Sequence, residues 1–189
     1  MSTSPPTGRD ALLERVIAFF VENGVGDTSL RAVAAATSTS HRMLIYHFGS
    51  REGLLTAVVA QVWESQQAVM EELVDTHPGD PSGGAWLYWK MVADRDVLAP
   101  LVFEMSAQAM HEAPWKDTFT QGHEHMVQQV AERLVAFGEP RQRAFTLSRM
   151  CVAIMLGALW ELRLTGDRTA ADATVRTFLE AMWPSSAQD

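Results

Sequence analysis

Apolar residues recur at intervals of three and four along almost the whole chain of 189 residues. In the first such segment Leu13, Val16 and Phe20 fall on one face of a helix. No segment shows the strict alternation of apolar and polar residues that marks a half-buried strand. The pattern therefore predicts an all-α fold.

Cap and turn residues divide this pattern into about nine helices. Gly24 and Gly49 are placed to end helices, Ser40 and Ser50 are placed to begin them, and "HPGDPSGG" is typical of a loop. We expect a helix before Gly24, one from Thr28 or Ser29, one from Ser40 to about His47, one from Ser50 toward His77, and five more at Trp86–Val92, Leu98–Met110, Trp115–Phe137, Pro140–Leu164 and Thr169–Met182.

Composition indicates a soluble protein of the cytoplasm. Cys151 is the one cysteine, so no intrachain disulfide can form, and a reducing compartment fits. The N-terminus lacks the apolar segment of a signal peptide, and we expect residues 1–8 to be a disordered tail. The apolar run Met150–Trp160 is shorter than a bilayer requires. We therefore expect no membrane partner.

Charge is distributed unevenly between the two ends of the chain. The net charge is −8, but residues 1–49 contain four arginines and four acidic residues and are neutral. All the excess negative charge lies after residue 49. This asymmetry permits a polyanion partner at the N-terminal end without requiring one.

The segment from Thr28 to Phe48 has the layout of a helix-turn-helix motif, with two short helices joined by a turn of about four residues. In that motif the start of the second helix reaches base edges in the major groove of DNA. Arg42 can bind guanine through two hydrogen bonds, and Met43 can contact a thymine methyl group. The candidate DNA contacts are Thr28, Ser29, Arg31, Thr39, Ser40, His41, Arg42, Met43, Tyr46, His47, Ser50 and Arg51.

The stretch "TSLRAVAAATSTSHRMLIYHFGSREGLL" resembles the signature of the tetracycline-repressor (TetR) family of transcription regulators. The resemblance covers about the first third of the chain, and it departs from the family pattern at Ser38, Arg42 and Ile45. It implies a three-helix DNA-binding domain at residues 1–49 and a larger domain at 50–189 that binds a small ligand and dimerises. It also implies that His47 contacts phosphate and that Arg51 anchors the fourth helix to the DNA backbone.

Large apolar and aromatic side chains are spread over the middle helices, which predicts a cavity for a small apolar or aromatic effector. Basic residues are few in this region, whereas Glu104 on an otherwise apolar helix leaves a cationic ligand open. His123 fits a core histidine and a pocket residue equally well. The candidate ligand contacts are Trp63, Met70, Trp86, Trp89, Phe103, Met110, Phe119, His123, Met126, Met150 and Ile154.

The helix from Pro140 to Leu164 is apolar nearly all round, so both of its sides should be covered. We expect a two-fold homodimer in which the last two helices pair with their copies as a four-helix bundle. The candidate interface residues are Cys151, Met155, Leu156, Leu159, Leu162, Val175, Phe178, Leu179 and Met182.

No enzymatic or metal chemistry is indicated. His123 and His125 are two residues apart, so on a helix they point about 200° away from each other and cannot share a metal ion. We expect no catalytic residues, no cofactor and no metal. The sequence thus favours a repressor that a small ligand releases from a palindromic double-stranded DNA operator. Two alternatives stay open: a helical enzyme or ligand carrier that uses the motif only for packing, and a regulator controlled by a protein partner.

Overall fold

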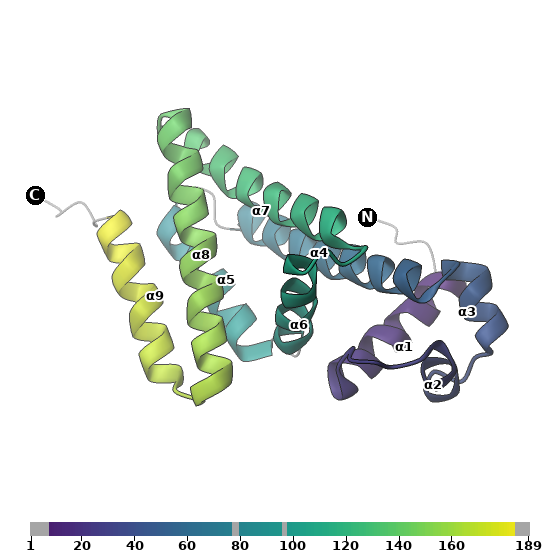
Figure 1. The fold of residues 1–189 in the computed structure, drawn as a ribbon. Helices are drawn as coiled ribbons and strands as arrows, with labels where there is room; N and C mark the ends of the chain where they lie inside the picture. The colour runs from purple at the N-terminus through teal and green to yellow at the C-terminus, as the bar shows by residue number, and fades with distance from the viewer. Residues whose placement is uncertain (1–7, 77–79, 96–97, 184–189) are drawn as a thin grey trace, which may run out of the picture. The chain divides into compact units, whose positions relative to one another are not determined.

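A computed structural model describes residues 8–76, 80–95 and 98–183. These residues form helices and no strand, which confirms the predicted all-α class. Residues 1–7 of the expected tail lie outside the described residues, and Gly8 already belongs to the first helix. Within the described ranges the helices are α1 (Gly8–Asn23), α2 (Leu30–Ala36), α3 (His41–Phe48), α4 (Arg51–Thr76), α5 (Pro81–Arg95), α6 (Ala99–Met110), α7 (Lys116–Ala136), α8 (Arg141–Thr165) and α9 (Arg168–Met182) (Figure 1).

Side-chain caps fix where the two short helices begin. Ser29, not Thr28, caps α2, and its Oγ accepts a hydrogen bond from the backbone N–H of Ala32 at 3.3 Å. Ser40 caps α3 in the same way, accepting from the N–H of Met43 at 3.1 Å. Each cap offers a side-chain acceptor to an N–H of the first helical turn, where donors lack the usual acceptor four residues earlier. These caps set the start of the helix that carries the candidate base contacts.

The chain divides into two compact units, at residues 1–63 with 100–121 and at residues 64–99 with 122–189. The first unit contains α1–α3, the first half of α4, α6 and the beginning of α7. The second contains the end of α4, α5, the rest of α7, α8 and α9. The boundaries between the two compact units lie within α4 and α7 and not at residue 49. A DNA-binding domain at residues 1–49 and a ligand-binding domain at 50–189 therefore stay a prediction.

The first unit buries one face of each of its short helices. Val16 and Phe20 of α1, Val33 of α2, and Leu44 and Phe48 of α3 are all buried. Helix α2 packs against both α1 and α3. Because Leu44 and Phe48 lie four residues apart, they hold one side of α3 against this core and leave the other side in solvent.

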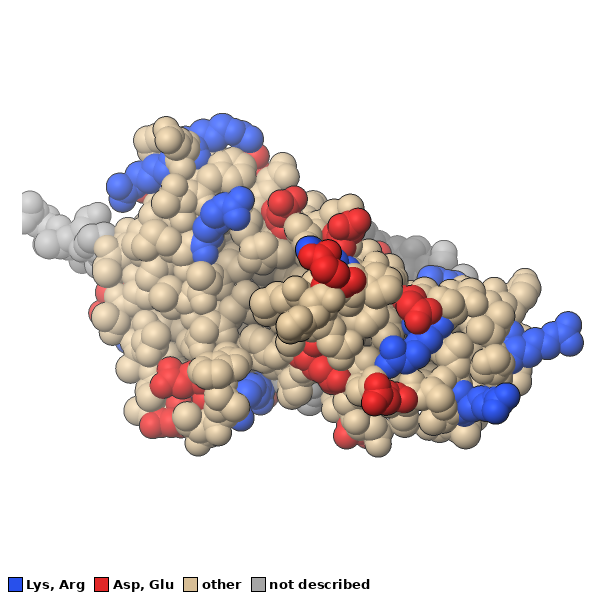
Figure 2. Space-filling view, viewed as in Figure 1, with Lys and Arg blue, Asp and Glu red and all other residues tan. Residues whose placement is uncertain are grey.

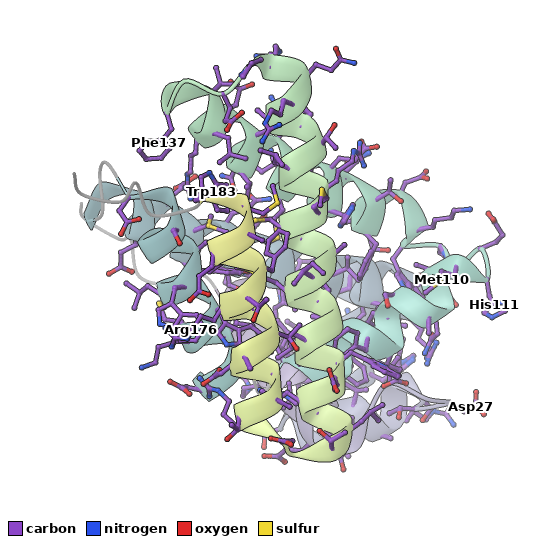
Figure 3. All side chains as sticks on the ribbon, turned by 90° about the vertical axis from the view of Figure 1, so that its left-hand side faces the viewer. Asp27, Met110, His111, Phe137, Arg176 and Trp183 are labelled. Carbon is purple, nitrogen blue, oxygen red and sulfur yellow. The ribbon has the colours of Figure 1, made fainter. Side chains whose placement is uncertain are left out.

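In the second unit α8 and α9 lie side by side and antiparallel, joined by a turn at Gly166, and α5 packs against both (Figures 1 and 3). Among the described helices, α8 alone is long and apolar enough to cross a membrane by length and composition. The buried core helix of a soluble protein has the same properties, and α8 packs against α5 and α9 here.

Candidate DNA-binding helix and ligand cavity

The outer face of α3 presents side chains that can reach DNA. His41, Arg42 and Met43 in its first turn are exposed, and Tyr46 one turn later is 77% exposed. Ile45, where the family pattern commonly has tyrosine, is exposed as well. One solvent-facing side of this helix therefore carries a cation, a thioether, a phenol and an imidazole.

Other candidate contacts surround this helix in the first unit. Ser29, Arg31 and Ser50 are exposed, whereas Thr39 and His47 are half-buried. The rings of Tyr46 and His47 meet edge to face, with their centroids 4.9 Å apart. Figure 2 shows arginine side chains extending from the surface of α2 and α3, with Asp and Glu side chains nearby.

Arg51 lies differently from the position that the family resemblance implies. Its guanidinium is turned to the loop between α1 and α2, where Nε donates to the carbonyl of Thr28 at 3.0 Å. Nη2 donates to the carbonyls of Gly26 and Val25. The side chain is half-buried. In this structure Arg51 therefore bonds its own chain, and a phosphate contact by this residue stays a prediction.

Glu104 binds the same loop, a role that the sequence does not predict. Its carboxylate accepts hydrogen bonds from the backbone N–H of Val25 at 2.9 Å and of Gly26 at 2.8 Å, and from Nε2 of Gln108 at 3.3 Å. The signal in the sequence was a single charge on an otherwise apolar helix, which we interpreted as leaving room for a cationic ligand. The carboxylate instead accepts hydrogen bonds from backbone amides, and it does not line the cavity described next.

The second unit contains a partly open cavity of about 390 Å³. It lies among the end of α4, α5, α7, α8 and Trp183, and its wall is mainly apolar. Met70, Met126 and Met155 give it a thioether-rich lining that can adapt to differently shaped apolar molecules. Phe137 and Trp183, which also line it, are labelled in Figure 3.

Polar groups at the cavity wall are engaged with protein partners. The hydroxyl of Tyr88 donates to Oε1 of Gln66 at 3.0 Å. Arg133 donates to the carbonyl of Met70 at 2.9 Å and contributes one positive charge, while Asp80 contributes one negative charge. A wall with balanced charges and satisfied polar groups suits a neutral, mainly apolar molecule.

The cavity includes some of the residues expected from the sequence and omits others. Met70, Trp89 and Met126 line it. Of the rest, Met110 is 74% exposed and Trp86 lies under the guanidinium of Arg176, 4.2 Å from the ring centroid. The remaining expected contacts outside the lining are Trp63, Phe103 and Phe119 of the first unit and His123, Met150 and Ile154 of the second.

The lining residues that the sequence does not predict come mostly from α7 and α8. We expect Cys151, Met155, Leu156 and Leu159 at the dimer interface, but all four line the cavity, and the sequence predicts no role for Val130 and Arg133. Apolar character alone does not reveal which side of an amphipathic helix faces a cavity. The cluster of Met70 and Tyr88 with their half-buried apolar neighbours became visible only in the packed structure.

The surface of α8 that remains open carries a second apolar stripe. Met150, Trp160 and Leu164 are 43%, 55% and 65% exposed, and the exposed Ala153 and Gly157 lie between them. Five expected interface residues are instead buried within their own chain: Cys151, Leu159, Leu162, Val175 and Leu179. The other four expected interface residues are half-buried: Met155, Leu156, Phe178 and Met182.

Within the described part of the chain, no three or more His, Cys, Asp or Glu side chains gather so as to hold a metal ion. His123 is half-buried on α7, and His125 is exposed.

Comparison with known protein families matches residues 12–58 to the model described as "Bacterial regulatory proteins, tetR family". The chain is also 29% identical over 85 residues to the HTH-type transcriptional repressor Rv3405c of Mycobacterium tuberculosis. An HTH-type transcriptional regulator of Mycobacterium bovis, Mb3439c, matches to the same extent. These alignments cover 38% of this chain and 45% of each relative, so the chain spans less than half the length of the curated relatives it matches.

Solved structures resemble the whole described fold. A TetR transcriptional regulator from Legionella pneumophila matches with a TM-score of 0.76 at 18% identity, covering 96% of this chain and 99% of that one. GusR of Salmonella enterica matches with a TM-score of 0.76 at 21% identity, with 95% and 97% covered. The multidrug binding protein EbrR, complexed with imidazole, matches with a TM-score of 0.69 at 20% identity, with 97% and 93% covered. At these identities the likeness shows the fold alone.

Proposed function

The chain belongs to the TetR family of transcriptional regulators, and we propose that it is a cytoplasmic repressor which a small, neutral, apolar ligand releases from a palindromic operator. The observation that carries this proposal is the outer face of α3. There Arg42, Met43 and Tyr46 extend into solvent from a helix whose start is fixed by the Ser40 cap. That arrangement suits insertion into the major groove, with the first turn at the base edges.

The weak charge of the first 49 residues limits how DNA can be held. With four arginines against four acidic groups, general attraction to DNA is small. Hydrogen bonds and apolar contacts to bases, together with backbone amides at helix starts, must supply a large share of the affinity. Binding should therefore depend strongly on sequence and only moderately on salt.

The cavity supports the ligand half of the proposal. Its volume of about 390 Å³ lies in the range of small-molecule sites, and its wall is apolar with one charge of each sign. EbrR, which shares the fold, is described as a multidrug binding protein. A ligand shifts the equilibrium between two conformations only if it binds one of them better. Helix α4 begins at Arg51 in the first unit and supplies Met70 to the cavity, so it is the continuous element that can carry such a shift.

A palindromic operator requires a two-fold assembly. Two copies of α3 must lie about 34–36 Å apart to read successive major grooves. The exposed stripe of Met150, Trp160 and Leu164 on α8 offers an apolar face that a second copy can cover. We therefore propose a homodimer that pairs through this face of α8 and the neighbouring face of α9.

DNA binding is tested by selecting duplexes from a random library and measuring their affinity by gel shift over a range of salt. We expect a palindromic sequence to be enriched and its affinity to fall as salt rises. Failure to enrich any sequence would contradict the repressor function and favour an enzyme or carrier that uses the motif only for packing.

Ligand release is tested with the neutral, apolar fluorescent dye 1-aminoanthracene. The dye should bind saturably and weaken binding to the selected duplex. The variant Met155→Trp fills the cavity and should abolish dye binding, whereas Met150→Trp places the same ring on the exposed side of α8 and should not. Saturable dye binding with unchanged DNA affinity would favour control by a protein partner.

A further inference from the structure

The loop between α1 and α2 is held from two sides by groups of opposite charge. On one side the carboxylate of Glu104 accepts the N–H groups of Val25 and Gly26 at 2.9 and 2.8 Å. On the other side the guanidinium of Arg51 donates to the carbonyls of the same two residues and, at 3.0 Å, to the carbonyl of Thr28. The carboxylate of Glu104 accepts hydrogen bonds from backbone N–H groups, and the guanidinium of Arg51 donates hydrogen bonds to backbone carbonyls. Each charged group is therefore paired with the backbone groups that it can bind.

This loop has few other means of holding one conformation. Gly24 and Gly26 have φ angles of +73° and +33°, in the region where glycine is favoured. Val25 between them is fully buried, and its carbonyl accepts one backbone hydrogen bond, from the N–H of Thr28 at 3.2 Å, while its own N–H is left to Glu104. Hydrogen bonds to charged groups are roughly twice as strong as those between neutral groups. Arg51 and Glu104 are therefore the main polar constraints on this segment.

The loop leads directly into the DNA-binding helices. Ser29, the N-cap of α2, follows Thr28, whose carbonyl Arg51 holds. Helix α2 in turn packs against α3. A change in the loop would therefore alter the start of α2 and, through this packing, the orientation in which α3 meets DNA.

We propose that Arg51 and Glu104 are positioning residues for operator binding: both act through the α1–α2 loop, and neither acts by contacting DNA. This inference rests on the proposed function. It gives Arg51 a role other than the phosphate contact implied by the family pattern, and it makes α6, which carries Glu104, part of the DNA-binding unit.

The backbone at Gly24 agrees with this role. A Cβ atom added to Gly24 would lie 3.3 Å from Oε2 of Glu104, closer than comfortable van der Waals contact. Glycine at this position thus leaves room for the carboxylate to reach the next two amides, in addition to permitting the positive φ.

Whether Glu104→Ala weakens or tightens DNA binding distinguishes a positioning role of Glu104 from a simple effect of its charge. Removing an acidic group from a DNA-binding protein reduces repulsion of the phosphates, so on charge alone Glu104→Ala should tighten binding. If Glu104 positions the loop, the same substitution weakens binding. Glu22→Ala is the matched control, because Glu22 is an exposed carboxylate near the end of α1 in the same unit.

The experiment compares Glu104→Ala, Glu104→Gln, Arg51→Ala and Glu22→Ala on a duplex selected by the wild type and on a random-sequence duplex. We expect Glu104→Ala to weaken binding to the selected duplex by about tenfold or more, with Glu104→Gln intermediate because its amide oxygen can still accept one N–H. Binding to the random duplex should change much less, and Glu22→Ala should bind both as tightly as the wild type or tighter. Arg51→Ala should weaken selected binding and leave the slope of affinity against salt unchanged.

Amide hydrogen exchange gives a second readout that does not require DNA. In Glu104→Ala the amides of Val25 and Gly26 should exchange about tenfold faster or more, while amides in α8 keep wild-type rates. Circular dichroism checks folding, and if Glu104→Ala does not fold, Glu104→Gln provides the test.

Three results would overturn the proposal: wild-type or tighter binding of the selected duplex by Glu104→Ala, unchanged exchange at Val25 and Gly26, or a salt slope lowered by about one in Arg51→Ala, which marks a lost phosphate contact. A wild type that selects no duplex would defeat the proposed function and the positioning role with it. The exchange measurement would then still report whether Glu104 holds the loop.

Discussion

The indole Nε1 of Trp89 donates a hydrogen bond to Oδ1 of Asp172 at 2.6 Å, which ties the cavity wall on α5 to α9. Nε of Arg168 donates to the same oxygen at 2.7 Å, and Arg168 also pairs with Asp94 on α5. A buried aromatic ring that lines the cavity is thereby held by a charged network that reaches the surface.

Asp172→Ala should lower the free energy of unfolding by about 1–3 kcal/mol, because it leaves the Trp89 N–H without its acceptor in a mainly apolar environment. Urea denaturation followed by circular dichroism measures the change. Glu180→Ala, which removes an exposed carboxylate from the same helix, should change stability little. Equal effects of the two substitutions would contradict a role for the Trp89–Asp172 bond.

Stability should also depend on pH through Asp172. Burial raises the pKa of its carboxyl, but hydrogen bonds from Arg168 and Trp89 and the charge of Arg168 outweigh burial, so the pKa in the folded state lies below the ordinary value of 3.8. A lowered pKa means that the folded state releases this proton more readily than the unfolded state. The stabilisation is therefore present above about pH 4 and is lost as the pH falls through the lowered pKa.

The measurement compares urea midpoints of the wild type and Asp172→Asn from pH 7 down to pH 3. The difference between the two proteins should shrink below about pH 4, where the carboxyl begins to take up a proton in the unfolded chain before it does so in the folded protein. A difference that stays constant over this range would show that the charge of Asp172 contributes nothing to folding.

The thiol of Cys151 should be almost inert in the folded protein. Burial raises its pKa from 9.0 to about 12, so the reactive thiolate is about a thousandfold scarcer at neutral pH than in the unfolded chain. Alkylation by iodoacetamide, followed by mass spectrometry, should be correspondingly slow in buffer and fast in urea. Labelling at comparable rates in both solutions would mean that the cavity wall on α8 opens readily.

Helical spacing and caps predicted the fold because both are local properties of the sequence. The Ser40 cap indicated the start of α3, so the side chains of its first turn could be named in advance. The cavity could not, because its lining depends on how each long helix is rotated. Met150 and Met155 both lie on α8, yet one is exposed and the other lines the cavity.

The role of Glu104 was beyond sequence reasoning for a different reason. Its partners Val25 and Gly26 lie more than seventy residues earlier in the chain, and the contact is to backbone groups, which carry no side-chain pattern. The sequence marked the position as unusual because it is a charge on an apolar helix. Only the structure shows that the carboxylate faces a loop and not a ligand.

Arg42→Ala should reduce affinity for the selected duplex by about 1–3 kcal/mol and relax the preference at one base pair of each half-site. Arg42 is an exposed cation in the first turn of α3, where a side chain can reach a guanine edge. Lys90→Ala removes an exposed cation from α5 and serves as the control. Selection from a random library with each variant measures the preference directly, and an unchanged motif for Arg42→Ala would remove this residue from base reading.

The exposed stripe on α8 leads to a prediction about assembly. Trp160 is 55% exposed and Leu164 is 65% exposed, and together with Met150 they follow one side of α8 at helical spacing. Leu159, one residue from Trp160, is buried in its own chain, so a charge placed there would test folding and not assembly. Trp160→Glu is the informative substitution, because it puts a charge on the open face and leaves the core unchanged.

Light scattering at micromolar concentration should give the wild type twice the mass of one chain, which is 20.9 kDa, and should give Trp160→Glu the mass of one chain. Met110→Glu is the matched control: Met110 is 74% exposed on α6, so the same kind of charge is added away from α8 and the dimer should persist. A monomer cannot span both halves of a palindrome, so Trp160→Glu should also lose most of its affinity for the selected duplex while keeping the wild-type helical content. A wild type that is monomeric, or a Trp160→Glu variant that stays dimeric, would remove α8 from the interface.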